Sequence, residues 1–525
     1  MYSLALRIHF EAFRRWPSAY LTAAKWRIMG KRLRATGQFA GLLGQTSLAY
    51  KWWVLRQSAQ LAPSLPDTPP IVALVDGRNG QPDTLATLAS LTSEGLCGHL
   101  IGTDAPADLV RAAAAIDWTA SPWLLPMPAG DLLAPGAARA YRAAIRANAG
   151  ISAVFADDDL LDRRGSRAAP YFKPDWNAEL HRHHDTLTGA CIVKTARAGL
   201  EAVTTEADWA GALVTRAVAD GGTAAHITQV LHHRRTRRTP HLPLPRPAIA
   251  DKLPRVSVIV PTRNRLDLLS TCIAGLEATD YPDLEVIVVD NDSDDPATLA
   301  FLAALPERGM RVLRHAGAFN YSAINNRAVA EATGELVCLL NNDIEILVPD
   351  WLAIMATQAM RQEVGAVGAQ LLYPDGRIQH AGVVTGVGNA AGHAHRFLRP
   401  EDEGYFRRHA LPQFTAAVTA ACLVVQRKRF VAVGGLDEVR FKVAFNDVDL
   451  CLRLNARGWQ SLYEPRAVLV HHESVSRGLD QDPVGAARFA GELAELQKAW
   501  GTDRKFDPFH HPQLSRVSEQ FALAL

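Results

Sequence analysis

The sequence predicts an α/β protein in which a mostly parallel sheet carries helices on both faces. Three apolar segments of strand length, residues 256–260, 286–290 and 336–340, alternate with amphipathic stretches of helical period. Each of these strands is followed by a short run of polar residues. Because ligands bind at the carboxyl ends of parallel strands, we expect a binding site where these runs meet. A weaker alternation over residues 71–238 predicts a second α/β domain in tandem.

Composition narrows the class of protein. The 525 residues are 48% hydrophobic, which leaves room for roughly two to four domains with their own cores. A formal net charge of +2 argues against a general nucleic-acid binder. The six cysteines are scattered singly without a C-x-x-C spacing, as expected for reduced thiols in a cytoplasmic protein. Since no apolar run reaches about eighteen residues, we expect no transmembrane helix.

Two proline-rich stretches divide the chain. Prolines cluster over residues 63–70 and again over residues 240–247. We therefore predict five segments: a basic helical arm (1–62), a first α/β domain (71–238), a linker (239–254), a second α/β domain (255–480) and a C-terminal helical strap (481–525). We expect the strap to cover the second domain and its histidines to be surface or packing residues.

The arm is strongly basic. Ten lysines and arginines stand against the single acidic residue Glu11, and four tryptophans lie among them. One interpretation is a segment that lies on anionic lipid at the inner face of the membrane. The alternative is a helical arm that packs on the folded body, and the sequence does not decide between them.

One carboxylate stands at the end of a buried strand in the second domain. The strand 336–340 is followed by Asn341, Asn342 and Asp343. A carboxylate at such a position is costly unless a cation meets it, so Asp343 is a candidate metal ligand. His471 directly follows another apolar strand, 467–470. A single histidine there is by default a packing residue, but the shared sheet edge makes it a candidate partner of Asp343.

Asp447 and Asp449 lie at the predicted start of a helix. Either carboxylate could simply cap the first turn. Because the two side chains are two residues apart on a helix, they point in different directions, and at most one faces a given cleft. The other is expected to be structural.

Taken in order, these segments resemble the family-2 inverting glycosyltransferases of GT-A fold. The likeness covers residues 254–515 and is closest to the bacterial polysaccharide and O-antigen branch, which includes rhamnosyltransferases. It is carried by residues 261–264 (PTRN), 288–293 (VVDNDS), 320–326 (NYSAINN), 339–343 (LLNND), 434–437 (GGLD), 446–449 (NDVD) and 471–478 (HHESVSRG).

The resemblance implies a role for each matching residue. The nucleotide sugar would be bound by Pro261, Thr262, Arg263, Asn264, Asp290, Ser293, Asn325, Asn341 and Asn342. Asp343 and His471 would hold Mn²⁺ or Mg²⁺, and Asp447 would be the general base, with Asp449 as the fallback. The chain departs from the family pattern at Asn341, where the family has aspartate, and at Asn446, where it has an acid.

The implied function is metal-dependent transfer of a sugar, with inversion, from a nucleotide-diphosphate donor to a glycan hydroxyl. The acceptor would be a bacterial cell-surface glycan or its lipid-linked precursor, and rhamnosyl transfer is one option. We expect a cytoplasmic protein, with peripheral membrane contact if the arm binds lipid. The first domain resembles a degenerate, non-catalytic copy, with Ala129-Gly130-Asp131 at the metal position. The run Asp157–Asp159 has the composition of a solvated turn.

Two other functions remain open on the sequence alone. The first is a non-catalytic carbohydrate-binding or scaffolding protein with a transferase-like fold. Retention of Asp343, Asp447 and His471 together argues against it, since a binder does not need all three. The second is a nucleotidylyltransferase, which would need a glycine-rich basic loop after its first strand. Residues 261–264 do not provide that loop.

Overall fold

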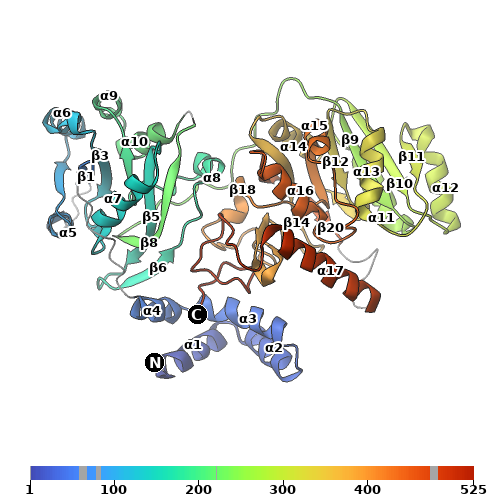
Figure 1. The fold of residues 1–525 in the computed structure, drawn as a ribbon, viewed down its shortest axis with the longest axis horizontal. Coiled ribbons are helices and arrows are strands. Elements are labelled where there is room, and N and C mark those ends of the chain that lie inside the picture. Colours follow the sequence, from blue (N-terminus) through green and yellow to red (C-terminus); the bar gives the residue numbers. More distant parts are fainter. Residues whose placement is uncertain (1, 58–67, 79–83, 220, 473–482) are drawn as a thin grey trace.

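The computed structural model describes residues 2–57, 68–78, 84–219, 221–472 and 483–525. Two large sheets lie side by side, and the N-terminal helices lie below them in Figure 1. Among the described helices, none has both the length and the apolar character that a membrane span requires.

The first sheet occupies the N-terminal half of the chain. Its strands are β1 (Ile71–Asp76), β2 (Cys97–Ile101), β3 (Trp123–Pro128), β4 (Leu132–Leu133), β5 (Ala153–Leu161), β6 (Arg167–Tyr171), β7 (Cys191–Lys194) and β8 (Ala224–Arg234). The helices are α5 (Thr84–Ser93), α6 (Ala105–Ala115), α7 (Ala137–Ala147), α8 (Ala178–His183), α9 (Arg197–Glu201), α10 (Trp209–Val218) and the 3₁₀ turn Trp118–Ala120.

The second sheet follows the proline-rich segment. Its strands are β9 (Val256–Thr262), β10 (Leu284–Asp290), β11 (Arg311–Arg314), β12 (Leu336–Leu340), β13 (Ile344–Ile346), β14 (Val364–Leu372), β15 (Ile378–His380), β18 (Gln413–Thr415), β19 (Cys422–Gln426) and β20 (Gln460–His471), with β16 (Val383–Thr385) and β17 (Ala391–His393) as a separate ribbon. The helices are α11 (Leu266–Glu277), α12 (Pro296–Ala304), α13 (Tyr321–Glu331), α14 (Trp351–Ala359), α15 (Arg427–Ala432), α16 (Asn446–Asn455) and the 3₁₀ turns Leu305–Arg308, Val387–Asn389 and Arg408–Ala410.

The two sheets share one strand order. The first runs β2-β1-β3-β7-β5-β8-β4, and the second runs β10-β9-β12-β19-β14-β20-β13 after its additional edge strand β11. Each neighbouring pair also has the same direction in both sheets. A residue at a strand tip of one sheet therefore has an equivalent position in the other.

The predicted α/β character is confirmed, but the expectation of a mostly parallel sheet is wrong. Strands β11, β10, β9 and β12 are parallel, as their apolar runs predict. Beyond them β19 enters antiparallel to both β12 and β14. The direction of β19 is set by its long connection from β14, which the period of apolar residues does not reveal.

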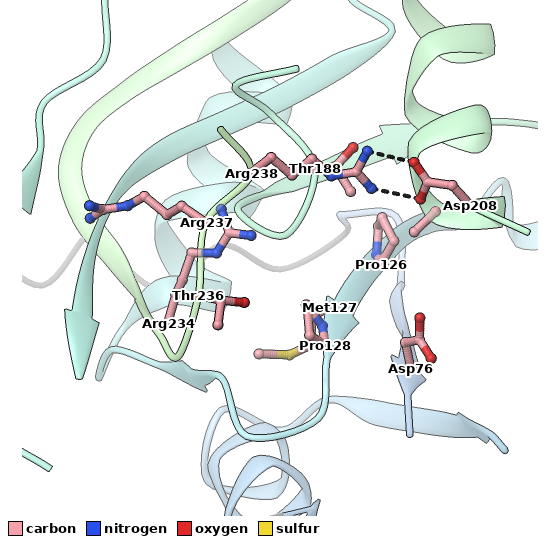
Figure 2. A pocket seen from close by; sticks show the side chains of 11 residues that line it. Asp76, Pro126, Met127, Pro128, Thr188, Asp208, Arg234, Thr236, Arg237 and Arg238 are labelled. Atoms are coloured by element: carbon pink, nitrogen blue, oxygen red, sulfur yellow. Dashed lines mark hydrogen bonds and ion pairs between the residues drawn. The ribbon is translucent and has the colours of Figure 1, made fainter. Parts of the chain in front are cut away.

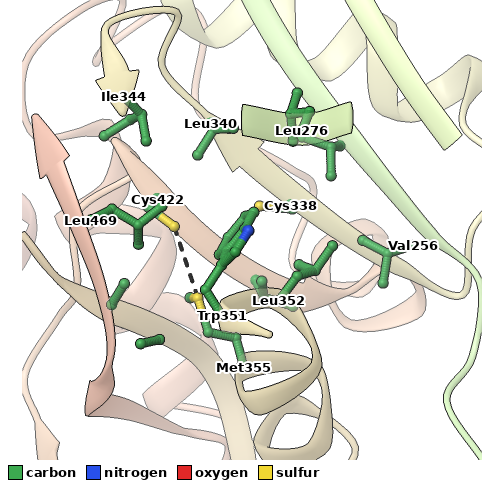
Figure 3. Packing of buried hydrophobic residues seen from close by; sticks show 14 of the residues in the cluster. Val256, Leu276, Cys338, Leu340, Ile344, Trp351, Leu352, Met355, Cys422 and Leu469 are labelled. Atoms are coloured by element: carbon green, nitrogen blue, oxygen red, sulfur yellow. Dashed lines mark hydrogen bonds between the residues drawn. The ribbon is translucent and has the colours of Figure 1, made fainter. Parts of the chain in front are cut away.

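One core of the second half lies between the sheet and α14, and a second lies on the other face beneath α13 and α16. Trp351 and Met355 of α14 pack against Cys338 and Cys422 of the sheet (Figure 3). Trp351 is completely buried, and its indole nitrogen donates a hydrogen bond to Thr279. This packing fixes the two strands β12 and β19, whose neighbouring residues form the candidate site described below.

The N-terminal helices α1 (Tyr2–Arg15), α2 (Pro17–Ile28), α3 (Arg32–Gly44) and α4 (Ser47–Arg56) form the arm. Helix α4 packs on the folded body, because Tyr50 and Trp53 are buried against Phe172. The packing interpretation therefore holds for α4. In contrast, Leu6, Phe10 and Ile28 on α1 and α2 are 71%, 68% and 87% exposed.

The C-terminal segment contacts all three parts of the chain. It begins with α17 (Pro483–Trp500) and continues without regular structure to Leu525. Gln513 accepts a hydrogen bond from Trp53 of the arm at 2.8 Å, and Asp507 accepts one from the amide of Thr385 in the second half at 2.7 Å. The carbonyl of Pro508 accepts one from the amide of Asp175 in the first half. The segment thus joins the arm to both halves of the chain.

The acidic run Asp157–Asp159 takes part in the contacts that join the arm and the C-terminal segment to the first half of the chain. The expectation of a solvated turn is therefore wrong. All three residues lie in β5 and are fully buried. Asp158 forms an ion pair with Lys173 at 2.8 Å, and Asp159 accepts a hydrogen bond from Tyr50 of the arm at 2.6 Å. The sequence predicts a solvated turn here because the cationic partners of the three aspartates are distant in sequence.

Asp157 is held by two histidines. Its carboxylate lies 3.0 Å from Nε2 of His226 and 2.8 Å from Nε2 of His511. These three side chains also have the composition of a metal site. However, the backbone N–H of Gln513 donates to Nδ1 of His511, which leaves the proton of a neutral His511 on Nε2, 2.8 Å from Asp157.

His226 is therefore best described as an imidazolium. Its Nδ1 lies 3.0 Å from Asp175 while its Nε2 faces Asp157, so each nitrogen meets a carboxylate. Burial alone lowers the pKa of His226, but the charges and hydrogen bonds of the two aspartates raise it above its ordinary value overall. The arrangement is a buried ion-pair cluster that attaches the C-terminal segment to β5 and β8.

This cluster predicts a loss of stability at alkaline pH. Because the pKa of His226 is raised on folding, its contribution is complete below the unfolded value and disappears as pH rises through the folded value. We expect the thermal midpoint of the wild type to fall between about pH 6 and pH 9 by more than that of His226→Gln. The exposed His241→Gln is the control, and identical pH profiles for wild type and His226→Gln would contradict the assignment.

Candidate active site

The first part of the site is formed by the tips of β9 and β10. Their register places Thr262 opposite Asp290. Asp290 accepts a hydrogen bond from the amide of Ser293, and the hydroxyl of Ser293 accepts one from the amide of Asn264 at 2.8 Å. The Asn264 side chain bonds in turn to Asp294. The two loops therefore hold each other in one conformation, and four predicted nucleotide-site residues lie together.

Asn264 and Arg265 occupy an unusual backbone conformation. Both have positive φ, 53° and 54°, immediately before α11 begins. Such a conformation is tolerated because the Asn264 side chain accepts hydrogen bonds from the amides of Asp294 and Asp295. Of the other predicted nucleotide contacts, Pro261 is buried in β9 and Arg263 is exposed at its tip.

The predicted metal ligands come together. Asp343 follows β12 and precedes β13, which pairs with β20 so that Ile344 lies opposite His471. Nε2 of His471 is 3.1 Å from Oδ1 of Asp343. Asn341 lies beside them, its amide nitrogen 3.3 Å from the same imidazole nitrogen, and Asn342 donates to Thr262 at 3.0 Å. The metal and nucleotide positions thus form one continuous edge.

The histidine is oriented by Gln379. Nδ1 of His471 lies 2.6 Å from Oε1 of Gln379, so it carries a proton and the ring turns Nε2 toward Asp343. Nε2 lies 3.1 Å from the buried Oδ1 of Asp343 and 3.3 Å from the amide nitrogen of Asn341. An imidazole nitrogen and a carboxylate oxygen this close together can both be ligands of one divalent cation once Nε2 is unprotonated. The sequence places Gln379 between the metal strand and the base helix, among candidate acceptor contacts, but no spacing links it to a histidine 92 residues away.

The contact with His471 keeps the carboxyl of Asp343 in its charged form. Burial raises the pKa of the carboxyl, but the hydrogen bond and charge of His471 hold it below its ordinary value overall. Asp343 is 4% exposed and is therefore a buried carboxylate at neutral pH. The predicted segment beyond His472, residues 473–478, lies outside the described residues.

Asp447 and Asp449 have different surroundings, as predicted. Asp449 is fully buried, pairs with Arg453 at 2.8 Å and accepts a hydrogen bond from Trp500. It is structural. Asp447 is partly exposed and accepts hydrogen bonds from the amides of Ala420 and Val448 and from the side chain of Thr419. Burial raises its pKa above the ordinary value against these hydrogen bonds.

Residues 420–421 separate the two candidate site carboxylates, Asp343 and Asp447. The amide of Ala420 binds Asp447, while the carbonyl of Ala421 accepts a hydrogen bond from the amide of Asn341. Tyr321 donates to the carbonyl of Ala420, and its pKa is raised by burial and by the charges of Asp447 and Asp343. Residues 420–421 therefore lie between the metal position and Asp447, with Tyr321 beside both.

Asn325 does not join this group. Its side chain is fully buried on α13 and donates a hydrogen bond to the carbonyl of Tyr321. It thus supports the helix that carries Tyr321, and its contact with substrate stays a prediction. Its position in the family-like segment 320–326 gave no sign that the side chain faces inward.

The chain is similar to one described family and to several known proteins. Residues 257–428 match the family described as Glycosyl transferase family 2. The chain is 38% identical over 440 residues to "Uncharacterized protein y4gI" of Sinorhizobium fredii and 34% identical over 438 residues to "O-antigen biosynthesis protein RfbC" of Myxococcus xanthus. These matches cover 75% of this chain but only 48% and 34% of the relatives, so the chain spans less than half of either.

A third relative covers about half of the chain. It is "N-acetylglucosaminyl-diphospho-decaprenol L-rhamnosyltransferase" of Mycobacterium tuberculosis, 27% identical over 275 residues, which are 48% of this chain and 87% of the relative. The strands that carry Thr262, Asp290 and Asp343 all lie within the matched family region. Residues 257–428 of this chain are therefore a glycosyl transferase family 2 domain.

Proposed function

We propose that the chain is a metal-dependent inverting glycosyltransferase. It would move a sugar from a nucleotide-diphosphate donor to a hydroxyl of a bacterial cell-surface glycan or its lipid-linked precursor. The observation that carries the proposal is the 3.1 Å approach of Nε2 of His471 to the buried Oδ1 of Asp343, beside the loops of Asp290 and Asn264. The name of the mycobacterial relative supports rhamnosyl transfer as the first reaction to test.

The donor would bind across the tips of β9, β10 and β12. Asp343 and His471 would hold Mn²⁺ or Mg²⁺, which when bound neutralises charge on a leaving diphosphate. Asp290 has one carboxylate oxygen without a hydrogen-bond donor among the described residues, although Arg314 lies 3.5 Å from it. That oxygen is available to accept an N–H of the base. Asn342 and Thr262 fix the distance between the two ends of this binding edge.

The acceptor hydroxyl would be activated by Asp447. The raised pKa of this carboxyl makes it a better proton acceptor than an ordinary surface aspartate. Asp447 lies across residues 420–421 from the metal position, and these residues are alanines, so a sugar can approach the backbone closely. Attack from the face opposite the nucleotide inverts the anomeric centre in one displacement, without a covalent glycosyl-enzyme.

The first sheet would be a degenerate copy of the GT-A-like domain. Its strand order and directions match the second sheet, which places Asp131 at the position of Asp343 and His233 at that of His471. However, His233 pairs with Asp159 at 2.7 Å, and Asp131 accepts hydrogen bonds from Arg234 and from the amide of Arg235. Arg234 and Arg235 satisfy Asp131 without a metal ion, so we propose no catalysis there.

The arm would attach the protein to the inner face of the membrane. Helices α1 and α2 combine exposed Leu6, Phe10 and Ile28 with several arginines and lysines, a composition suited to an anionic lipid surface. A lipid-linked acceptor would then be delivered to the same surface as the enzyme.

Metal binding can be measured without turnover. We expect Asp343→Asn to weaken Mn²⁺ binding in the presence of a uridine or thymidine diphosphate by about tenfold or more, because one of two protein ligands loses its charge. Isothermal titration would measure this. Glu345→Gln is the matched control, since Glu345 is 44% exposed and pairs with His472. Equal Mn²⁺ affinity in wild type and Asp343→Asn would remove Asp343 from the site.

Transfer itself tests Asp447. We expect Asp447→Asn to lower kcat by about 10²–10⁴-fold with donor affinity unchanged, because the amide keeps the shape but cannot accept the proton. Nucleotide sugars, dTDP-rhamnose first, would be assayed for release of the nucleoside diphosphate with a lipid-linked acceptor. Asp375→Asn, on an exposed turn, is the control. A variant that binds donor and turns over normally would refute the role of Asp447, and a wild type that binds donor but never transfers would favour a non-catalytic binder.

Vesicle flotation tests the arm. Wild type should bind vesicles that contain anionic lipid and fail to bind zwitterionic ones, and Leu6→Ser with Phe10→Ser should weaken binding by about tenfold or more. Leu85→Ser is a matched control, because Leu85 is 79% exposed on α5 of the first half. Equal flotation of the arm variant and the wild type would show that α1 does not contact lipid.

A further inference from the structure

The first sheet carries a cleft at the edge that corresponds to the donor-binding edge of the second. It lies at the carboxyl ends of β1 and β3, beside the residues that follow β8 (Figure 2). Its volume is about 190 Å³. Ligand sites for drug-sized molecules are roughly 300–1,000 Å³, so this cleft is too small for a whole nucleotide sugar. It has the size of one monosaccharide unit.

The cleft is lined by a buried hydroxyl. Thr188 is only 6% exposed, and its side chain lies beside the carboxylate of Asp185. That carboxylate can accept the hydroxyl proton, which leaves the lone pairs of Oγ1 to accept a hydrogen bond from a group in the cleft.

The charges of the cleft are already balanced. Arg238 makes two hydrogen bonds to Asp208, at 2.5 and 2.6 Å, as Figure 2 shows. Arg237 pairs with Asp158, and Arg234 lies 3.4 Å from Asp131. Each arginine that lines the cleft therefore faces a carboxylate. A phosphate would have to displace these carboxylates, whereas a neutral ligand would leave every ion pair in place.

The residues that line the cleft provide both hydrogen-bonding groups and an apolar surface, as binding of a sugar ring requires. Thr188 and Thr236 present hydroxyls, and the outer lone pairs of Asp76 and Asp208 can accept hydrogen bonds from further hydroxyl groups. Pro126, Met127 and Pro128 of β3 form an apolar side against which the C–H groups of a ring can pack. Polar and apolar surfaces face each other across a space of one ring.

We propose that this cleft binds a single neutral sugar residue of a glycan, without a metal ion. The site is separate from the Asp343–His471 edge and does not depend on the proposed transfer reaction. It gives the non-catalytic first half a binding role, in which it holds one unit of a glycan chain while another part of the molecule acts elsewhere. Affinity for an isolated monosaccharide should be weak, about millimolar, because so few atoms are in contact.

Saturation-transfer NMR on the full chain tests this proposal. The probes are free L-rhamnose, D-glucose, D-galactose, D-mannose and N-acetyl-D-glucosamine, each titrated in the presence of EDTA. We expect at least one to give a saturable signal that is weakened about fivefold or more in Thr188→Val, which removes the hydroxyl and keeps the shape. Ala210→Leu fills the cleft without removing a polar group and should abolish the signal.

Two controls separate this site from the rest of the molecule. Thr92→Val changes a threonine on α5 whose hydroxyl bonds only within its own helix, and it should bind like the wild type. Asp343→Asn should also bind like the wild type, so failure of the transferase proposal would not affect this result. The proposal is overturned if no sugar binds, if Thr188→Val and Ala210→Leu bind normally, or if inorganic phosphate displaces the sugar, which would indicate an anion site.

Discussion

The candidate active site depends on the pairing of two short strand ends. Strand β13 has only three residues, yet its antiparallel register with β20 places Ile344 opposite His471 and so brings Asp343 against the imidazole. Gln379 then fixes the ring so that Nε2 points at the carboxylate. A shift of one residue in this pairing would turn one of the two side chains to the other face of the sheet. Every chemical role proposed for this edge follows from that register.

The same register occurs in the first sheet with the opposite chemical result. There β4 pairs with β8 so that Leu132 lies opposite His233. Burial raises the pKa of Asp131 to about 6, and Arg234 beside it opposes that rise. An arginine is a fixed cation that needs no second ligand, so it can satisfy a buried carboxylate where a metal would otherwise be required. The same strand order thus carries the candidate metal position in the second sheet and a cleft whose charged groups are already paired in the first sheet.

The two halves are held together by buried polar contacts. Asn177 of the first half exchanges two hydrogen bonds with the backbone of Phe414 in β18, and Glu179 pairs with Arg361 at 2.6 Å. The C-terminal segment adds the contact of His511 with Asp157. Such contacts need exact partners, because a buried charge without one is strongly destabilising. They therefore favour a fixed arrangement in which the first cleft, the arm and the second site keep their relative positions.

The sequence by itself determined the α/β class, the strands that end in Thr262, Asp290 and Asp343, and the pairing of Asp343 with His471 through the logic of the sheet edge. Apolar runs and polar tips are local signals, so a single sequence contains them. Only the tertiary structure decided the mixed direction of the sheets, the burial of Asp157–Asp159, the inward-facing Asn325 and the role of Gln379. Each of these features depends on a contact with a residue far away in the chain. The charge or size of a residue does not indicate which distant residue it contacts in the folded protein.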